Sequence, residues 1–140
     1  MNVKQVIVIR TQYSDGKGGT TGIRKGKLIS QGSHASMAFM SHILQEAIQN
    51  QSIPKLSSPV EEWVKGIFTK IVLQVDNEET LLEIDKAAKE VGLLSNLITD
   101  CGMTEFNGVP TITALAIGPD YSEKIDEITG PNGKFNLKLY

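Results

Sequence analysis

Lys27, Gln31 and His34 recur at helical spacing in a segment without proline. At about 100° per residue, positions i, i+4 and i+7 fall on one face of a helix. Such a row offers hydrogen-bond donors that could hold a phosphate group or polarise a carbonyl. A solvated helix face produces the same pattern, and we expect this polar face to lie opposite the core.

A second group of chemically capable side chains stands in the six-residue turn from Asp100 to Glu105, which also contains Thr104. The turn follows a predicted strand, and α/β sheets commonly carry ligand-binding loops at strand ends. Asp100 is therefore a candidate general base or orienting acceptor. Ordinary turn chemistry is the alternative, because Asp and Thr side chains also bond to nearby backbone groups. We expect Cys101, in the same turn, to be buried, as free cysteines commonly are.

Several common cofactor and metal sites are excluded by spacing. The pair Gly26-Lys27 lacks both the earlier glycine and the following hydroxyl residue of a Walker loop, because Thr21 and Leu28 occupy those positions. Thr21 also breaks a dinucleotide-binding fingerprint. The chain has one cysteine and two histidines, and the histidines are eight residues apart, about 12 Å along a helix. We therefore predict no metal site, no Walker-type nucleotide site and no dinucleotide site.

Length and composition are those of one globular domain spanning residues 1–140. The chain has 140 residues and a mass of 15.3 kDa, with 40% hydrophobic and 21% charged residues. No run approaches the ~18 to 20 apolar residues that a membrane span needs. The first residues predict a strand rather than a signal peptide, so a cytoplasmic location without membrane association is expected.

The charge distribution is uneven along the chain. The net charge is −2, yet residues 1–34 carry +5 and residues 35–140 carry −7. This asymmetry favours an anion-binding patch near the N-terminal end, although a solvated lysine-rich loop gives the same charge pattern. The basic residues of this part are Lys4, Arg10, Lys17, Arg24, Lys25 and Lys27.

The elements that must position these groups follow from hydrophobic periodicity. Strands are expected over 3–11, 67–75, 93–99 and 110–117, and helices over 25–50, around Trp63, from Asp76 to about 91, and from about Asp120. Glycine, serine and threonine mark 12–22 as a long loop. The alternation in the tail after Gly130 could add to a sheet edge. This order predicts an α/β fold with a mixed sheet.

Taken together, these segments resemble the type-2 peptidyl-tRNA hydrolases over nearly the whole chain. No single motif is specific, but their order and spacing are. The matching segments are Lys4 to Thr11, Lys25 to Ala35 with its Gln and His-Ala signature, Lys70 to Val75, Asp100-x-Gly102-x-Thr104-Glu105, Leu115 to Pro119, and Ile128 to Gly130.

The resemblance implies a three-layer α/β/α sandwich with a four-stranded mixed sheet, often dimeric, that hydrolyses the ester between peptide and tRNA without a cofactor. It implies functional groups at Lys27, Asp100 and Thr104, with Gln31 and His34 in the supporting helix. We expect Asp100, helped by Thr104, to position or deprotonate the water and Lys27 to stabilise negative charge. The residues expected to bind substrate are Gln31, His34, Glu105, Lys17, Arg24 and Lys25.

The sequence also departs from the family pattern near this site. Gln12 replaces a common acid, Met103 stands where arginine is common, the loop 13–23 is longer, and 131–136 is an insertion. A protein with the same fold that binds tRNA or other RNA without cleaving it is the alternative. A homodimer stays an open expectation.

Overall fold

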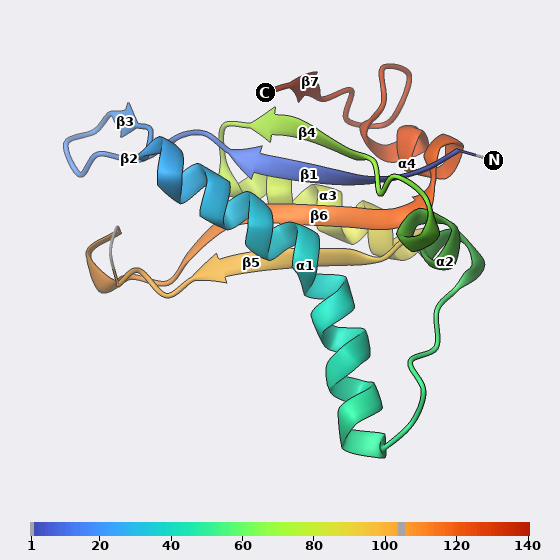
Figure 1. Cartoon of the computed structure of the whole chain (residues 1–140). Coiled ribbons are helices and arrows are strands. Elements are labelled where there is room, and N and C mark those ends of the chain that lie inside the picture. The colour runs from blue at the N-terminus through green and yellow to red at the C-terminus, as the bar shows by residue number, and fades with distance from the viewer. Residues whose placement is uncertain (1, 104–105) are drawn as a thin grey trace.

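The computed structural model describes residues 2–103 and 106–140, and within these ranges it is an α/β protein built on a mixed sheet (Figure 1). The strands are β1 (Val3–Arg10), β2 (Tyr13–Ser14), β3 (Thr20–Thr21), β4 (Lys70–Val75), β5 (Ser95–Asp100), β6 (Thr111–Tyr121) and β7 (Lys138–Leu139). The helices are α1 (Lys25–Asn50), α2 (Ser58–Lys65), α3 (Glu78–Glu90), α4 (Ser122–Thr129) and the short 3-10 turn η1 (Phe106–Gly108).

The main sheet has the strand order β5-β6-β1-β4-β7. β1 and β4 are parallel, whereas the other neighbours are antiparallel, so the predicted mixed sheet is confirmed. The expected count of four strands is wrong, because the tail adds β7 along the edge of β4. The alternation seen in the tail sequence therefore does mark a sheet edge.

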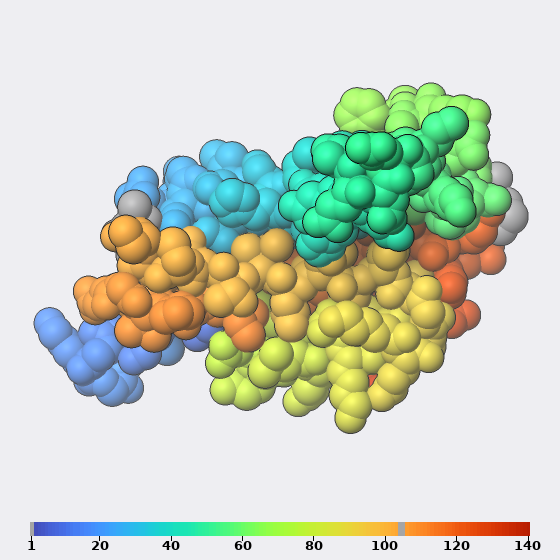
Figure 2. Space-filling model, turned by 90° about the horizontal axis from the view of Figure 1, so that it is seen from below, coloured from blue at the N-terminus to red at the C-terminus, as the bar shows by residue number. Residues whose placement is uncertain are grey.

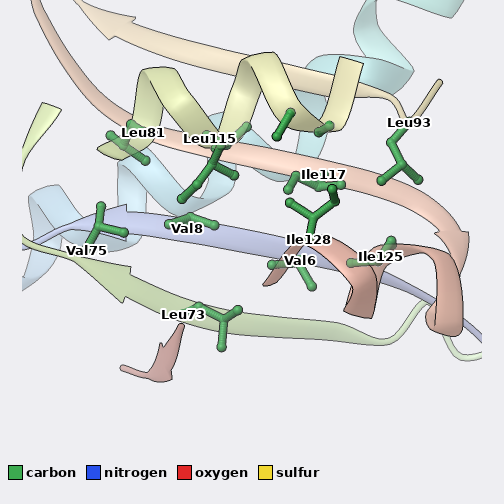
Figure 3. Close-up of a cluster of buried hydrophobic side chains, with 13 residues drawn as sticks. Val6, Val8, Leu73, Val75, Leu81, Leu93, Leu115, Ile117, Ile125 and Ile128 are labelled. Carbon is green, nitrogen blue, oxygen red and sulfur yellow. The ribbon is translucent and has the colours of Figure 1, made fainter. Parts of the chain in front are cut away.

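Successive residues of the central strands point to opposite faces of the sheet, as extended backbone requires. Val6 and Val8 of β1 pack against α3 and α4, together with Leu115 and Ile117 of β6 (Figure 3). Their neighbours in β1, Ile7 and Ile9, belong to a second cluster under α1. Helices therefore cover both faces, with α1 in front of the sheet in Figure 1 and α3 behind it.

α1 spans the predicted range and positions the candidate residues over the sheet. Its N-terminal half crosses the sheet, and its C-terminal half extends beyond the edge strand β5 (Figure 1). Phe39, in the middle of α1, packs against Val60 and Trp63 of α2, which fixes the angle at which the helix leaves the sheet. α1 is therefore held by the sheet along its N-terminal half and by α2 near its middle.

Several segments differ from the sequence-based prediction; one is β6, which continues to Tyr121 instead of ending at 117, so that α4 begins only at Ser122. The expected loop 12–22 forms a hairpin from β2 and β3, whose tip is held because the Asp15 carboxylate accepts hydrogen bonds from the amides of Lys17 and Gly19. The strand predicted from position 67 begins only at Lys70, because Phe68 has a left-handed φ of 40° that is incompatible with a strand. Among the described residues, no helix is long and apolar enough to cross a membrane.

Candidate active site

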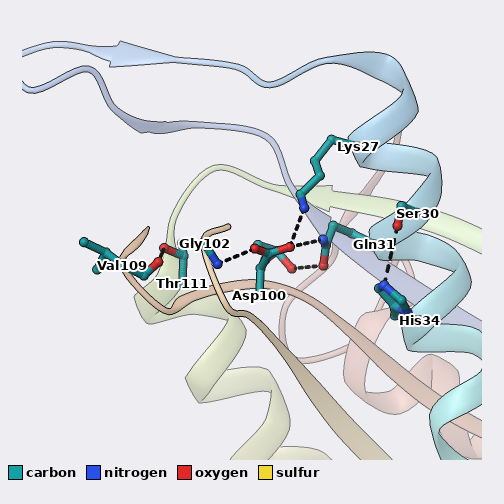
Figure 4. Close-up of polar contacts among 9 residues, drawn as sticks. Lys27, Ser30, Gln31, His34, Asp100, Gly102, Val109 and Thr111 are labelled. Atoms are coloured by element: carbon teal, nitrogen blue, oxygen red, sulfur yellow. Dashed lines mark hydrogen bonds and ion pairs between the residues drawn. The ribbon is translucent and has the colours of Figure 1, made fainter. Parts of the chain in front are cut away.

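Asp100 ends the edge strand β5 and points toward the first turns of α1 (Figure 4). The Lys27 ammonium lies 2.6 Å from Asp100 Oδ2. The two side chains come from elements far apart in sequence, and both are nearly buried, with 13% of Lys27 and 8% of Asp100 exposed. The fold thus brings together two of the residues singled out from the sequence.

Gln31 connects this ion pair to the sheet. Its amide nitrogen donates a 2.7 Å hydrogen bond to Asp100 Oδ2, and its carbonyl oxygen accepts a 2.6 Å hydrogen bond from the Thr113 hydroxyl. Gln31 is only 1% exposed. The expectation that the Lys27 and Gln31 face lies opposite the core is therefore wrong, because α1 lays this face on the ends of β5 and β6.

The second oxygen of Asp100 is held by the turn that follows it. The Gly102 amide donates a 2.7 Å hydrogen bond to Asp100 Oδ1. Gly102 has a φ of 81°, and a Cβ at this position would lie 2.5 Å from the Val109 carbonyl oxygen. Glycine is therefore required for the turn to fold back onto the carboxylate. Both oxygens of Asp100 are thereby oriented by three groups on two segments, α1 and the turn after β5.

The hydrogen bond from Lys27 is the main cause that holds the pKa of Asp100 below its ordinary value. Burial opposes this shift, and the hydrogen bonds from Gly102 and Gln31 reinforce it. Asp100 is therefore a carboxylate at neutral pH. Such a group can orient a water molecule and hold a cation, but it is a weak base.

The structure does not bring every expected residue to this cluster. His34 is exposed, and its ring lies 3.4 Å from the Ser30 hydroxyl on the outer side of α1 (Figure 4). Arg24 and Lys25 are exposed at the start of α1, and Lys17 is exposed at the tip of the hairpin. Thr104 and Glu105 lie outside the described residues. Cys101 is exposed, so the expectation of a buried thiol is wrong.

Thr113 is a site residue that the sequence reasoning missed. The pairing of β5 with β6 shifts by one residue at this point, since Ile98 is paired with Ala114 but Thr99 with Ile112. This bulge turns the Thr113 side chain toward Gln31, and bulges often re-aim a side chain beside a functional site. A bulge leaves little trace in a single sequence, although a threonine in an otherwise apolar strand is a weak indication.

An apolar groove of about 520 Å³ lies on the other side of α1, between that helix and β4. Its lining includes Leu28, Met37 and Val72 but neither Lys27 nor Asp100. The chemically capable side chains thus lie apart from this groove. In the described part of the chain, no three His, Cys, Asp or Glu side chains are grouped as a metal site would need.

Known proteins are similar to this chain over nearly its whole length. The family described as peptidyl-tRNA hydrolase PTH2 matches residues 3–140. The chain belongs to the PTH2 family. A peptidyl-tRNA hydrolase of Nanoarchaeum equitans is 38% identical over 138 residues, which is 99% of each chain. One from Methanopyrus kandleri is 37% identical over 127 residues, 91% of this chain and 93% of that protein.

The PTH2 match also extends to a eukaryote. A probable peptidyl-tRNA hydrolase 2 of Dictyostelium discoideum is 32% identical over 137 residues, which is 98% of this chain and 54% of that longer protein. The family resemblance seen in the sequence is therefore confirmed. Of the functional residues predicted from the sequence, the described structure brings Lys27, Gln31 and Asp100 into contact.

Proposed function

We propose that this chain hydrolyses the ester bond between the peptide and the 3′ ribose of peptidyl-tRNA and so returns the tRNA to translation. The observation that carries the proposal is the nearly buried Lys27–Asp100 pair at the end of β5, in a chain of the PTH2 family. Because this substrate arises during translation, we expect the protein to act in the cytoplasm, without a cofactor.

Ester hydrolysis requires an oriented water molecule, a stabiliser for the oxyanion and a proton for the leaving oxygen. In the proposed mechanism, Asp100 accepts a hydrogen bond from the water, which attacks the ester carbonyl carbon. Lys27, held in place by Asp100, stabilises the negative charge that develops on the carbonyl oxygen. The bond to the ribose oxygen then breaks, and a proton from the water neutralises that oxygen.

The other assignments stay proposals of the same kind. Gln31 is a positioning residue, because it contacts Asp100 rather than open solvent. From the family resemblance we expect Thr104 to help orient the water and Glu105 to take part in substrate binding. Lys17, Arg24 and Lys25 are exposed in the basic N-terminal part of the chain, and we expect them to contact RNA phosphates, with the exposed His34 as a further substrate contact. A homodimer is expected, and sedimentation would test it.

The decisive experiment measures release of tRNA from N-acetyl-aminoacyl-tRNA by the purified chain without added metal. Aminoacyl-tRNA with a free amine, assayed in parallel, is the substrate for comparison. We expect selective cleavage of the N-blocked ester, and a loss of about 10²- to 10³-fold in Lys27→Ala, as for removal of a principal charge stabiliser. Lys89→Ala is the matched control, because Lys89 also pairs with an aspartate but lies on α3.

Tight binding of tRNA without cleavage would instead support the RNA-binding alternative, and wild-type rates in Lys27→Ala would remove Lys27 from the mechanism. The salt dependence of binding tests the basic residues separately. Each lysine that contacts a phosphate contributes about one counterion to the slope of log K against log salt. Lys17→Ala should therefore flatten this slope by about 1 while leaving kcat unchanged.

A further inference from the structure

A cleft of about 370 Å³ separates the β2–β3 hairpin from the η1 turn. Residues that line it come from both sides, and they include Arg10, Tyr13, Ser14, Phe106, Asn107 and Thr111. Figure 2 shows the hairpin, in blue, projecting at one end of the molecule beside the orange segment that follows Asp100. None of the roles assigned above uses this cleft.

The cleft adjoins the Lys27–Asp100 pair. Thr111, on its wall, is paired directly with Asp100 across β5 and β6, which places their Cα atoms about 5 Å apart. Burial raises the pKa of the Tyr13 phenol to about 12, Arg10 lowers it, and the nearby charge of Asp100 raises it. Asp100 is therefore close enough to influence a side chain of the cleft, so one ligand can reach both places.

The lining has the chemistry of a nucleoside site. The half-buried Phe106 ring lies 4.7 Å from the Tyr13 ring, measured between ring centroids. The Arg10 guanidinium lies 4.4 Å from the centroid of the Tyr13 ring. Aromatic rings backed by a guanidinium are the groups on which unpaired bases stack. The Asn107 amide and the hydroxyls of Ser14 and Thr111 can hydrogen-bond to base edges and ribose.

One further observation disfavours a phosphate in the cleft, and a second indicates that the η1 turn is a functional segment. Asp15 also lines the cleft, and its negative charge disfavours an anion there. Phe106 and Asn107 both have left-handed φ angles, 61° and 52°, which non-glycine residues rarely adopt. Backbone held in such conformations is more common at functional sites. The turn thus presents an aromatic ring and an amide side by side, at a conformational cost.

We propose that this cleft binds the terminal nucleoside of the tRNA, with its ribose toward Asp100 and its base stacked on Phe106. This inference rests on the proposed hydrolase function, because that function places the ester of the 3′ ribose at Asp100. The base of the same nucleotide must then lie within one nucleoside length of the Lys27–Asp100 pair. The cleft beside Thr111 is at that distance and has the matching chemistry.

The test uses a stable amide analogue in which nitrogen replaces the 3′ oxygen of N-acetyl-aminoacyl-adenosine. A second analogue carries hydrogen in place of the base. Calorimetric titration of the whole chain should give tighter binding of the adenosine analogue. Phe106→Leu should weaken that binding about 5- to 100-fold, as loss of one stacked base does, and leave the baseless analogue unchanged. Phe106→Tyr, which keeps the aromatic ring, should restore the affinity.

Phe68→Leu is the matched control, since Phe68 is also a partly exposed phenylalanine with a left-handed φ, but it precedes β4 at the other end of the sheet. If Phe106→Leu fails to fold, Asn107→Gly tests the cleft instead, because glycine tolerates the φ of this position. We expect it to weaken only the adenosine analogue. Equal affinity of the two analogues for the wild type would overturn the proposal.

The two hypotheses fail in different ways. Hydrolysis of N-acetyl-aminoacyl-tRNA together with base-independent binding of the analogues contradicts the nucleoside cleft alone. Base-dependent binding without hydrolysis contradicts the proposed function and supports the cleft, because the amide analogues report binding without any chemistry. Equal weakening of both analogues by Phe106→Leu also contradicts stacking, since it indicates a general change in the shape of the turn.

Discussion

Asp85 and Asp100 are both nearly buried, and each is paired closely with a lysine. The partner of Asp85 is Lys89, one helical turn away on α3, with 58% of its side chain exposed. The partner of Asp100 is Lys27, which comes from another element and is only 13% exposed. Both carboxylates also accept a hydrogen bond from an uncharged side chain. The two pairs therefore differ in the solvent exposure of the lysine and in whether it comes from the same element as the aspartate.

This difference separates a structural carboxylate from a candidate catalytic one. Lys89 remains hydrated, so its pairing with Asp85 adds little free energy. Placing Lys27 and Asp100 together away from water costs desolvation energy that the attraction between them offsets only with good geometry. A nearly buried ion pair therefore contributes little to the stability of the fold, but it fixes the positions of both charged groups. Asp85 should therefore matter for folding and Asp100 for turnover.

The largest expected effect comes from replacing each carboxylate with its isosteric amide. Asp100→Asn removes the charge that holds Lys27 and orients water, so kcat/KM should fall by about 10²- to 10³-fold. Asp85→Asn weakens the hydrogen bonds from Ser95 and Lys89, which should cost about 1 to 3 kcal/mol of unfolding free energy and leave kcat unchanged.

Initial rates on N-acetyl-aminoacyl-tRNA and urea unfolding midpoints of both variants would measure these effects. The urea midpoint of Asp100→Asn also shows whether the loss of activity reflects unfolding. If Asp85→Asn reduced kcat as strongly as Asp100→Asn, the distinction between the two aspartates would have no basis. Wild-type activity in Asp100→Asn would have the same consequence.

Part of the Asp100 site could be predicted from the sequence, whereas the Asp85 pair was not predicted. Helical spacing placed Lys27 and Gln31 on one face, and the position of Asp100 after a strand marked a strand-end site. The burial of that face was predicted wrongly. Polar side chains on a helix indicate a solvent-exposed face unless a tertiary hydrogen-bond partner is known, and the sequence does not reveal such a partner. The partner, Thr113, depends on a bulge in β6, and the hairpin depends on the turn around Asp15. Both depend on how strands pair with one another, which a local sequence pattern does not predict.

A smaller effect is expected from the hydroxyl groups behind the two carboxylates. Thr113→Val leaves the buried Gln31 carbonyl oxygen without its donor, and Ser95→Ala removes the donor to Asp85. Each substitution should cost about 1 to 3 kcal/mol of unfolding free energy. Only Thr113→Val should also lower kcat, by about tenfold, the rate factor for about 1.4 kcal/mol of lost positioning.

The combination of Thr113→Val with Gln31→Met provides the control for this pair. When both partners are removed, no unsatisfied oxygen remains, so the stability loss should be smaller than the sum of the two single losses. The kcat of the double variant should stay low, because Asp100 has still lost the amide that orients it. Recovery of kcat together with stability would mean that Gln31 acts only on folding.

The smallest effect is the pH dependence of stability that Asp100 contributes. The pKa of Asp100 is lowered in the folded chain, above all by Lys27, relative to about 4 in the unfolded chain. A lowered folded pKa gives stability that is present above the unfolded value and is lost as the pH falls through the folded value. The unfolding free energies of the wild type and Asp100→Asn should therefore differ by a constant amount between pH 7 and pH 5.

Below about pH 4 this difference should shrink toward the value set by shape and hydrogen bonding alone. Urea titrations of both proteins from pH 7 to pH 3 would measure it. A wild type that instead gains stability relative to Asp100→Asn as the pH falls from 7 to 5 would mean that folded Asp100 takes up a proton near neutrality. In that case Asp100 would be a capable general base, and the role assigned to it here, a fixed charge that orients water and holds Lys27, would have to change.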